Sequence, residues 1–410
     1  MSSVVEISST SRFVSSSYAF VVPRYGATIG GGAETLVRLI AMHLAARGDQ
    51  VEVLTTCAKD NRTWENELEP GVSVEDGVIV KRFLVDPRDL ECWIPYQLQI
   101  HDGVRPPIDN QLDWLANSVN SVELYKYISD YQAQYRAIFF APYLFGTTFW
   151  GSLVAPEKSI LIPCLHDENY AYLESIRSMF KLVKGCIFNS APERDLAYQL
   201  YGQISGDEVG MGYDFKSYAG DYAKYFEDDF PYVLYIGRKE TGKNVHLLID
   251  NFIAYKEQQN ANPDLKLVIA GGGDFSDLFR DAALTRDDVI DIGYISEEQK
   301  RSLMQHALYF CQPSTNESFS IVIMEAWLLG TPVVVSGKCT VTRHHVVESN
   351  GGLYFSNVDD FIGITEAFLN DEEMRQELAH SGQNYIHTRY NWDAVLSRFD
   401  QVLNSIFPVQ

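Results

Sequence analysis

The chain has 410 residues, of which 46% are hydrophobic and 13% aromatic, so it can bury sizeable cores and is not a disordered protein. This length exceeds one ordinary hydrophobic core, and two domains are therefore expected. The formal net charge of −22 argues against nucleic acid as a partner, and it disfavours adhesion to anionic lipid through a polybasic segment.

The chain begins with a serine-rich stretch that leads into a strand, a glycine-rich loop and a helix. Residues 1–17 hold eight serines and no apolar core, so we expect a flexible lead there and not a signal peptide. A strand is predicted over residues 18–23 and a helix over residues 35–46, with Gly31 and Gly32 in the loop between them. Glycine lets the backbone come close to a ligand, and the first N–H groups of a helix can hold an anion.

A dinucleotide-binding fold would use a similar loop. That fold needs an acidic residue at the end of the second strand, which is where the ribose binds. Here the second strand ends at Leu54–Cys57, and Glu52 lies near its start. The sequence therefore argues against NAD or FAD as a cofactor.

Strand-like runs continue through the first half of the chain, at residues 51–55, 78–83, 137–141, 159–163 and 185–189. The stretch between Arg136 and Glu157 carries no charge, but it contains Pro142, Gly146 and Gly151. A strand, a turn and a further element explain this stretch better than a membrane span of about 20 apolar residues.

His166 directly follows the predicted strand at 159–163. Ligands of parallel α/β sheets bind at the carboxyl ends of the strands, so His166 is predicted to face a cleft. The alternative is a structural histidine held by Asp167, and the sequence leaves both open. His43, on the first predicted helix, is expected to lie in the core or on the surface.

The strand–helix alternation stops and then restarts. A second set of strands is predicted at residues 232–237, 265–270, 289–293, 307–312 and 332–335. Gly210 and Gly212 lie between the two sets and mark a hinge. We therefore divide the chain into the lead at 1–17, a Rossmann-like domain at 18–210, a second Rossmann-like domain at 211–392, and a C-terminal helix at 393–410 that packs back on the first domain.

Two loops of the second half contain glycines after a predicted strand. Arg238 and Lys243 lie in a glycine-bounded loop, and such cations suit a diphosphate because arginine offers a fork of donors and lysine a point charge. A solvated turn is the alternative. Residues 271–273 are all glycine, which indicates either a tight turn or the close approach of a ligand.

Glu317 and Glu325 have seven residues between them. The run after Phe319 is apolar, lacks proline and ends at Gly330, so it predicts a buried helix that carries Glu325 while Glu317 precedes it in a loop. A buried carboxylate needs a hydrogen-bond donor, and a sugar hydroxyl is one. On a helix the two residues would lie ~12 Å apart, whereas glycosidase carboxyls lie roughly 5–9.5 Å apart. The alternative is a surface helix that carries two acids.

The six cysteines are scattered and form no CxxC pair, so reduced, mostly buried thiols are expected and a zinc site or disulfide framework is not.

Taken in order, these motifs resemble the retaining glycosyltransferases of family 4, which have the GT-B fold. The set comprises Gly30–Glu34, Gly210–Asp214, Arg238 with Lys243, Val289–Ile295, the Glu317 and Glu325 pair, and Gly330–Val334. The resemblance covers nearly the whole chain. It implies an α/β protein with two Rossmann-like domains that face each other across a deep cleft, the first for the acceptor and the second for the nucleotide-sugar donor.

The resemblance also implies residue roles. Arg238 and Lys243 would hold the donor diphosphate, Glu325 the ribose hydroxyls and Glu317 the donor sugar. His166 would lie close to the reacting carbon, which makes His166, Glu317, Arg238 and Lys243 the expected catalytic set. The remaining donor contacts would come from the backbone at Gly31, Gly32, Ile295, Ser318, Phe319 and Ser320.

The implied chemistry needs no cofactor beyond the co-substrate, a nucleotide sugar such as a UDP- or GDP-sugar. Two cations can stabilise the leaving diphosphate where a metal ion otherwise would. The sequence has no Asp-x-Asp motif, so metal independence and no metal site are expected. The resemblance implies retention at the anomeric carbon, with attack on the face that the diphosphate leaves.

Three regions depart from the family pattern. Ser318 and Ser320 stand where many relatives have glycine, which would narrow the sugar pocket. Residues 343–345, Arg-His-His, replace an expected glycine pair, and we predict a loop without function, with an acceptor contact as the alternative. The segment 86–120 matches no motif, and we expect it to shape the choice of acceptor.

The sequence thus predicts a hexosyltransferase-type enzyme that transfers a sugar to a glycan, glycolipid, lipid-linked or small hydroxyl acceptor, in bacterial surface-polysaccharide or glycoconjugate biosynthesis. It is expected in the cytoplasm, with at most weak peripheral association at the inner face of the membrane. The alternatives are an epimerase or a phosphorylase on the same fold, or a non-catalytic protein that binds a glycan or a partner.

Overall fold

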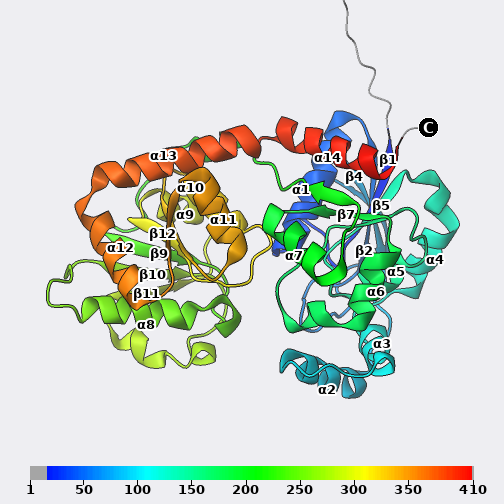
Figure 1. The fold of residues 1–410 in the computed structure, drawn as a ribbon, viewed down its shortest axis with the longest axis horizontal. Coiled ribbons are helices and arrows are strands. Elements are labelled where there is room, and N and C mark those ends of the chain that lie inside the picture. The colour runs from blue at the N-terminus through cyan, green and yellow to red at the C-terminus, as the bar shows by residue number, and fades with distance from the viewer. Residues whose placement is uncertain (1–15, 409–410) are drawn as a thin grey trace, which may run out of the picture.

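The computed structural model describes residues 16–408, which form two α/β lobes side by side (Figure 1). Each lobe contains one sheet whose strands alternate their buried side chains between two cores. In the first strand, for example, Tyr18 and Phe20 belong to one core while Ala19 and Val21 belong to another. Both faces of the sheet are therefore covered, as parallel sheets require.

The sheet of the N-terminal lobe has the order β3-β4-β2-β1-β5-β6-β7-β8, with β3 antiparallel to β4 and all other neighbours parallel. Its strands are β1 Ser17–Val21, β2 Gln50–Thr56, β3 Gly71–Glu75, β4 Val78–Phe83, β5 Ala137–Phe140, β6 Ser159–Leu161, β7 Gly185–Phe188 and β8 Gly206–Glu208. The helices are α1 Gly32–Arg47, α2 Leu90–His101, α3 Ile108–Ala116, α4 Val122–Tyr131, α5 Gly146–Ser152, α6 Glu174–Leu182 and α7 Ala191–Tyr201.

The sheet of the C-terminal lobe is parallel throughout, in the order β11-β10-β9-β12-β13-β14. Its strands are β9 Tyr232–Ile236, β10 Lys266–Ala270, β11 Val289–Gly293, β12 Tyr309–Gln312, β13 Val333–Ser336 and β14 Gly352–Phe355. The helices are α8 Val245–Lys256, α9 Glu297–Gln305, α10 Ile321–Leu328, α11 Thr340–Ser349, α12 Val358–Asn370, α13 Glu372–Arg389 and α14 Trp392–Ile406. Short 3-10 turns include η3 Phe215–Tyr218 and η4 Thr241–Lys243.

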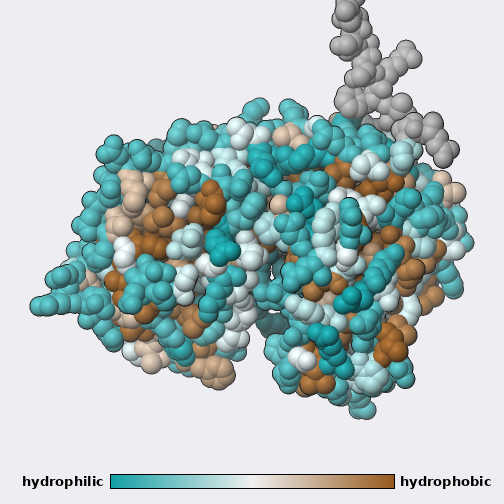
Figure 2. Space-filling view, viewed as in Figure 1, coloured by the Kyte–Doolittle hydropathy of each residue, from teal (hydrophilic) through white to brown (hydrophobic). Residues whose placement is uncertain are grey.

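Both sheets follow the doubly wound order, in which strands are added first to one side of the first strand and then to its other side. This switch in strand order lies between β1 and β5 in one lobe and between β9 and β12 in the other. Ligands of such sheets bind at the carboxyl ends of the strands near this switch. The prediction of two Rossmann-like domains is confirmed. Figure 2 shows the surface hollowed between the two lobes.

Every strand predicted from the sequence is present, with ends shifted by a residue or two, but three strands were missed. β3 lies at a sheet edge with most of its residues exposed, and β8 has only three residues, so neither carries a strong apolar signal. β14 begins at Gly352, whose backbone packs so closely on β13 that a Cβ there would lie 2.1 Å from the carbonyl oxygen of Val333.

The chain crosses between the lobes twice, and the two crossings are hydrogen-bonded to each other. The N–H of Tyr213 donates to the carbonyl of Tyr390 at 2.9 Å. Gly210 has φ +74°, and a Cβ there would lie 2.7 Å from the Tyr390 ring, so this position requires glycine. After the second crossing, α14 packs on β7 and β8, and its Phe399 ring lies 5.8 Å from that of Tyr18.

The predicted lead at 1–17 lies outside the described residues except for Ser16 and Ser17, and Ser17 belongs to β1. The uncharged stretch after Arg136 forms β5 and α5. Among residues 16–408, no helix combines the length and the apolar character that crossing a bilayer demands. The segment 86–120 contains α2 and α3, which lie at the lower end of the N-terminal lobe in Figure 1.

Candidate active site

The loop after β9 carries the predicted diphosphate cations and packs against the glycine run at 271–273. The N–H of Lys239 donates to the carbonyl of Gly272 at 2.7 Å, and a Cβ on Gly271 would lie 2.1 Å from the carbonyl oxygen of Gly237. The run of glycines therefore allows the two loops to pack closely, as a tight turn there requires.

Lys243 and Glu317 are brought together, although they are far apart in the sequence. Lys243 ends the turn η4, and its Nζ lies 2.8 Å from Oε1 of Glu317. Gln312, at the end of β12, lies with its Nε2 3.4 Å from the same carboxylate oxygen and 3.4 Å from Oγ of Ser320. An ion pair between a lysine and a glutamate thus lies in the loops that follow the carboxyl ends of β9 and β12.

Arg238 lies apart from this pair. Its side chain is 63% exposed and its Nη2 lies 3.1 Å from Oε1 of Glu240. The neighbouring Lys239 is instead 4% exposed and binds both carboxylate oxygens of Asp291, at 2.9 and 2.8 Å. The two cations thus differ in burial: Lys239 binds Asp291 of β11 in the interior, while Arg238 lies on the surface beside Glu240.

α10 begins at Ile321, so Glu317 lies in the preceding loop and Glu325 on the helix, as predicted. Glu325 is buried and accepts hydrogen bonds from Nζ of Lys300 at 2.9 Å and from the hydroxyl of Tyr218 at 3.1 Å. Burial disfavours the charge of Lys300, but the carboxylates of Glu325 and Glu297 raise its pKa above the ordinary value. The sequence missed Lys300 and Tyr218, because nothing near them in the chain marks them as partners of Glu325.

The loop between Glu317 and α10 keeps a glycine-like backbone without glycine. Ser320 has φ 67° and ψ 76°, in the left-handed region, which costs a residue with a side chain on the order of 1–3 kcal/mol. The Phe319 ring packs edge-on against Tyr390 and His345, with centroids 5.2 and 5.4 Å away. Its side chain is therefore part of the core, and only its backbone can face a ligand.

The N-terminal lobe touches this loop directly. Ser190, the N-cap of α7, donates from its Oγ to the carbonyl of Ser318 at 2.9 Å. Sequence reasoning missed Ser190, although a serine followed by proline two residues later, directly after a predicted strand, is a detectable sign of a helix start.

His166 follows β6 and is half-buried, with its Nδ1 3.7 Å from Oε1 of Glu168. Glu168 accepts a hydrogen bond from the hydroxyl of Tyr143 at 2.8 Å. The proposal that Asp167 holds His166 is wrong, because Asp167 accepts from the hydroxyl of Tyr172 at 2.6 Å instead.

The glycine-rich loop before α1 is tied down by Arg24, a further residue that sequence reasoning missed. Its Nη2 lies 2.5 Å from Oε1 of Glu34 and donates to the carbonyl of Gly30 at 3.3 Å. Gly31 is the N-cap of α1, and a Cβ there would lie 2.0 Å from the Glu34 carboxylate. Gly32, the first residue of α1, has open space around it.

Ile295, the other predicted donor contact, lies between β11 and α9. Its partly buried side chain packs against the same hydrophobic core that contains Tyr18 and Phe20.

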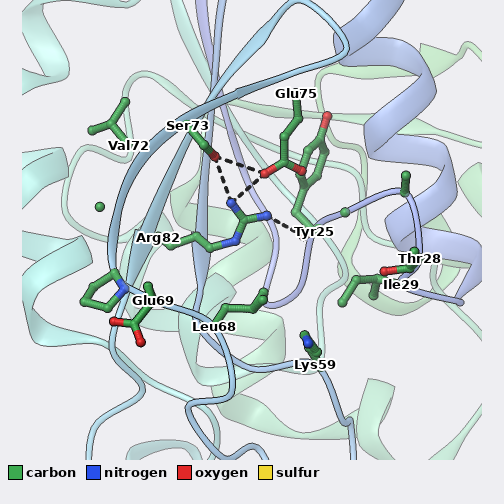
Figure 3. Close-up of a pocket in the computed structure, with 14 residues that line it drawn as sticks. Tyr25, Thr28, Ile29, Lys59, Leu68, Glu69, Val72, Ser73, Glu75 and Arg82 are labelled. Atoms are coloured by element: carbon green, nitrogen blue, oxygen red, sulfur yellow. Dashed lines mark hydrogen bonds and ion pairs between the residues drawn. The ribbon is translucent and has the colours of Figure 1, made fainter.

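The same glycine-rich loop forms one wall of a cavity of about 540 Å³ in the N-terminal lobe. Figure 3 shows Ser73 and Glu75 together on one side of the Arg82 guanidinium, with Lys59 and Ile29 on the other side. Arg82 donates to Oε1 of Glu75 at 2.6 Å and to the carbonyl of Tyr25 at 3.0 Å. The cavity therefore offers both charges, donors and acceptors, beside the loop that contains Gly31.

Residues 343–345 form part of α11, so the predicted loop is wrong. His345 is fully buried, its Nδ1 lies 2.9 Å from the Tyr385 hydroxyl, and burial lowers its pKa to about 3. This histidine is a core residue.

Residues 222–385 match the family model of the glycosyl transferases group 1. An uncharacterized glycosyltransferase of Methanocaldococcus jannaschii is 31% identical over 176 residues, which are 41% of this chain and 43% of that protein. The D-inositol 3-phosphate glycosyltransferase of Jonesia denitrificans is 24% identical over 410 residues, with 88% of each chain covered. The aligned part thus spans less than half of the first of these relatives.

Among solved structures, HepE of Anabaena in complex with UDP-glucose has a TM-score of 0.67 and 17% identity, and the match covers 96% of this chain and 100% of HepE. At that identity the likeness concerns the fold. The described chain has the GT-B fold of two facing Rossmann-like domains, and its residues 222–385 match the glycosyl transferases group 1.

Proposed function

We propose that this protein is a family 4 glycosyltransferase that moves a sugar from a nucleoside-diphosphate sugar to an acceptor hydroxyl, with retention and without a metal ion. The observation that carries the proposal is the Lys243–Glu317 pair, 2.8 Å apart at the carboxyl ends of β9 and β12. The likeness to HepE, whose structure holds UDP-glucose, and the family match of residues 222–385 support it.

In the proposed reaction, the bond between the anomeric carbon and the diphosphate oxygen breaks, and the acceptor oxygen bonds to that carbon on the same face. The acceptor proton passes to the departing phosphate. Lys243 and Arg238 stabilise the charge that develops on the diphosphate, which is the largest expected contribution to the rate. Glu317 exchanges its contact with Lys243 for contacts with the sugar, and Glu325 binds the ribose hydroxyls.

The acceptor would bind in the N-terminal lobe, in the cavity between the glycine-rich loop and Arg82. Its volume of about 540 Å³ suits one or two sugar rings, and its mixture of Lys59, Glu69 and Arg82 suits hydroxyl groups. His166 would lie between this cavity and the donor, against the reacting carbon.

A glycolipid or lipid-linked acceptor is compatible with the surface of α2. Leu90, Ile94 and Leu98 are exposed and lie four residues apart, hence on one face of the helix. The acidic chain makes an apolar contact with lipid more favourable than an electrostatic one. The protein should therefore float with vesicles of neutral lipid, and a protein that stays in the soluble fraction at every lipid concentration contradicts this contact.

The first test is thermal denaturation with a panel of nucleoside diphosphates and nucleotide sugars in the presence of EDTA. A ligand that binds only the folded state stabilises it by about 2.7 kcal/mol at 100 times its dissociation constant. We expect one base, UDP or GDP, to raise Tm, and the matching nucleotide sugar to release nucleoside diphosphate when an acceptor is present.

The product then decides the stereochemistry, because NMR coupling constants report the anomeric configuration. Turnover of the donor sugar without an acceptor indicates an epimerase. Binding of pyridoxal phosphate indicates a phosphorylase. If no nucleotide at millimolar concentration changes Tm, the proposed function is wrong.

A further inference from the structure

Glu193 is a carboxylate buried in the N-terminal lobe, beside the cleft, with no assigned role. It lies in the first turn of α7 and is 1% exposed. Its Oε1 accepts from the N–H of Leu165 at 2.6 Å and its Oε2 from the N–H of Asn189 at 2.5 Å. One side chain thus binds the loop after β6 and the loop after β7.

No cation compensates this charge within the described residues 16–408. Glu193 forms no ion pair there, and its two oxygens accept from backbone N–H groups of the loops after β6 and β7. Its place in the first turn of α7 also puts it near the positive end of that helix. Burial raises the pKa of Glu193 to about 8, while hydrogen bonds from Asn189, Leu165 and Ser190 act in the opposite direction. A buried carboxyl group without a cation costs stability in either protonation state unless its oxygens accept hydrogen bonds, and those of Glu193 accept from two loops.

Each N–H that Glu193 binds directly precedes a residue of the candidate site. Leu165 precedes His166, and Asn189 precedes Ser190, whose Oγ donates to the carbonyl of Ser318 in the other lobe. The β6 loop also has an unusual backbone, because Cys164 has φ 52°, in the left-handed region. Such a conformation persists only when its surroundings fix it.

We propose that Glu193 is a positioning residue that sets His166 and Ser190 against the donor loop at Ser318. Through Leu165 it fixes the direction of the loop that carries His166. Through Asn189 it fixes Ser190, which joins the N-terminal lobe to the loop between Glu317 and α10. The part that concerns His166 in the reaction rests on the proposed function, whereas the contact between the lobes does not.

The proposal requires an acceptor of two hydrogen bonds at this position. A glutamine has the same shape, but its amide nitrogen cannot accept, so one of the two N–H groups loses its partner. Glu193→Gln should therefore loosen one or both loops without removing volume from the core.

Glu52→Gln provides a matched control. Glu52 is a half-buried carboxylate in the same sheet, on β2, where it accepts from Lys81 at 3.0 Å and from the Tyr127 hydroxyl at 3.1 Å. It lies toward the start of β2, away from the carboxyl ends that face the cleft. Its replacement should change stability without affecting the cleft loops.

Amide hydrogen exchange of the full-length protein, followed by mass spectrometry, tests the proposal without any substrate. Glu193→Gln should speed exchange on the order of tenfold in residues 163–168 or 187–191, and in residues 316–321 across the cleft. Glu52→Gln should leave all three segments unchanged. Unchanged exchange in Glu193→Gln, or the same increase in both variants, would overturn the proposal.

If Glu193→Gln does not fold, Ser190→Ala gives the second variant, since it removes only the hydroxyl that donates to Ser318. It should speed exchange in residues 316–321 and leave residues 163–168 as they are. Unchanged exchange in 316–321 would refute the link between the lobes.

Activity gives an independent readout once a donor is identified. Glu193→Gln should lower kcat on the order of tenfold and weaken the Kd for UDP or GDP by a smaller factor, because only the loop at residues 316–321 links Glu193 to the lobe that is proposed to bind the nucleotide. A changed Kd with unchanged kcat would overturn the positioning role. Failure to find turnover with any nucleotide sugar would refute the proposed function, and hydrogen exchange would still decide on Glu193.

Discussion

The two lobes share one strand order but differ in how their sites are built. In the C-terminal lobe, charged side chains meet at the carboxyl ends of the strands, as in Lys243 with Glu317 and Lys300 with Glu325. In the N-terminal lobe, the site consists of backbone groups held by Arg24 and Glu193, a cavity beside Arg82, and His166.

This difference explains why the family model matches only the C-terminal lobe. The family match falls on residues 222–385, in the lobe to which we assign the side chains for the diphosphate and the ribose, and such ligands demand particular side chains. The N-terminal lobe, by contrast, presents main-chain atoms and a cavity, which many sequences can form. Topology alone therefore does not fix which residues a GT-B lobe uses.

The largest effect is expected at Lys243. Lys243→Ala should lower turnover on the order of 10²-fold or more, measured as release of nucleoside diphosphate, because the cation stabilises the leaving group. The control is Arg280→Ala in the same lobe, whose guanidinium pairs with Asp250 on the surface. If Lys243→Ala turns over like the control, the donor lobe does not hold the diphosphate here.

Glu325→Gln should mainly weaken nucleotide binding. Loss of a hydrogen bond to a charged group costs about 1.5–3 kcal/mol, so titration calorimetry should show Kd for the nucleotide about 10-fold higher or more. Glu366→Gln, at a half-buried carboxylate of α12 that lies beside Asn370, serves as the control. A larger loss in kcat than in affinity would contradict the assignment of Glu325 to the ribose.

His345 should make the donor lobe sensitive to acid. Its pKa falls to about 3 in the folded protein from an ordinary 6.5, through burial and the charges of His344 and Arg389. The unfolded chain therefore binds more protons between pH 3 and 6.5, and stability is lost as pH falls through this window. From pH 7.5 to 5.5 the free energy of unfolding should drop by about 1 kcal/mol more in the wild type than in His345→Gln. Urea unfolding at both pH values measures this difference, and equal losses would contradict it.

The smallest effect is expected at Lys59, in the N-terminal lobe. Lys59 is exposed at the edge of the cavity, so Lys59→Ala should raise the KM for the acceptor only a few-fold, corresponding to about 0.5–1 kcal/mol. The Kd for the nucleotide should not change, and Lys126→Ala on α4 should affect neither. A weaker nucleotide complex with an unchanged acceptor KM would reverse the division of roles between the lobes.

The sequence by itself predicted the two α/β domains and the placement of Glu317 in a loop and Glu325 on a helix, because each depends on local periodicity or a break in the pattern. It missed β3 and β8, whose residues carry weak apolar signals, and the short strand β14, which begins with a glycine. It also placed residues 343–345 in a loop, since polar residues conceal the helix α11 that buries His345.

Only the tertiary structure decided the partners of each charge. Lys300 meets Glu325 from a different helix, Asp167 binds Tyr172 and not His166, and Ser190 reaches Ser318 across the cleft. Periodicity and motifs depend on neighbours along the chain, and the sequence contains them directly. The partner of a buried charge depends on which elements pack together, because the cost of burial is offset by whichever donor the fold brings within hydrogen-bond distance.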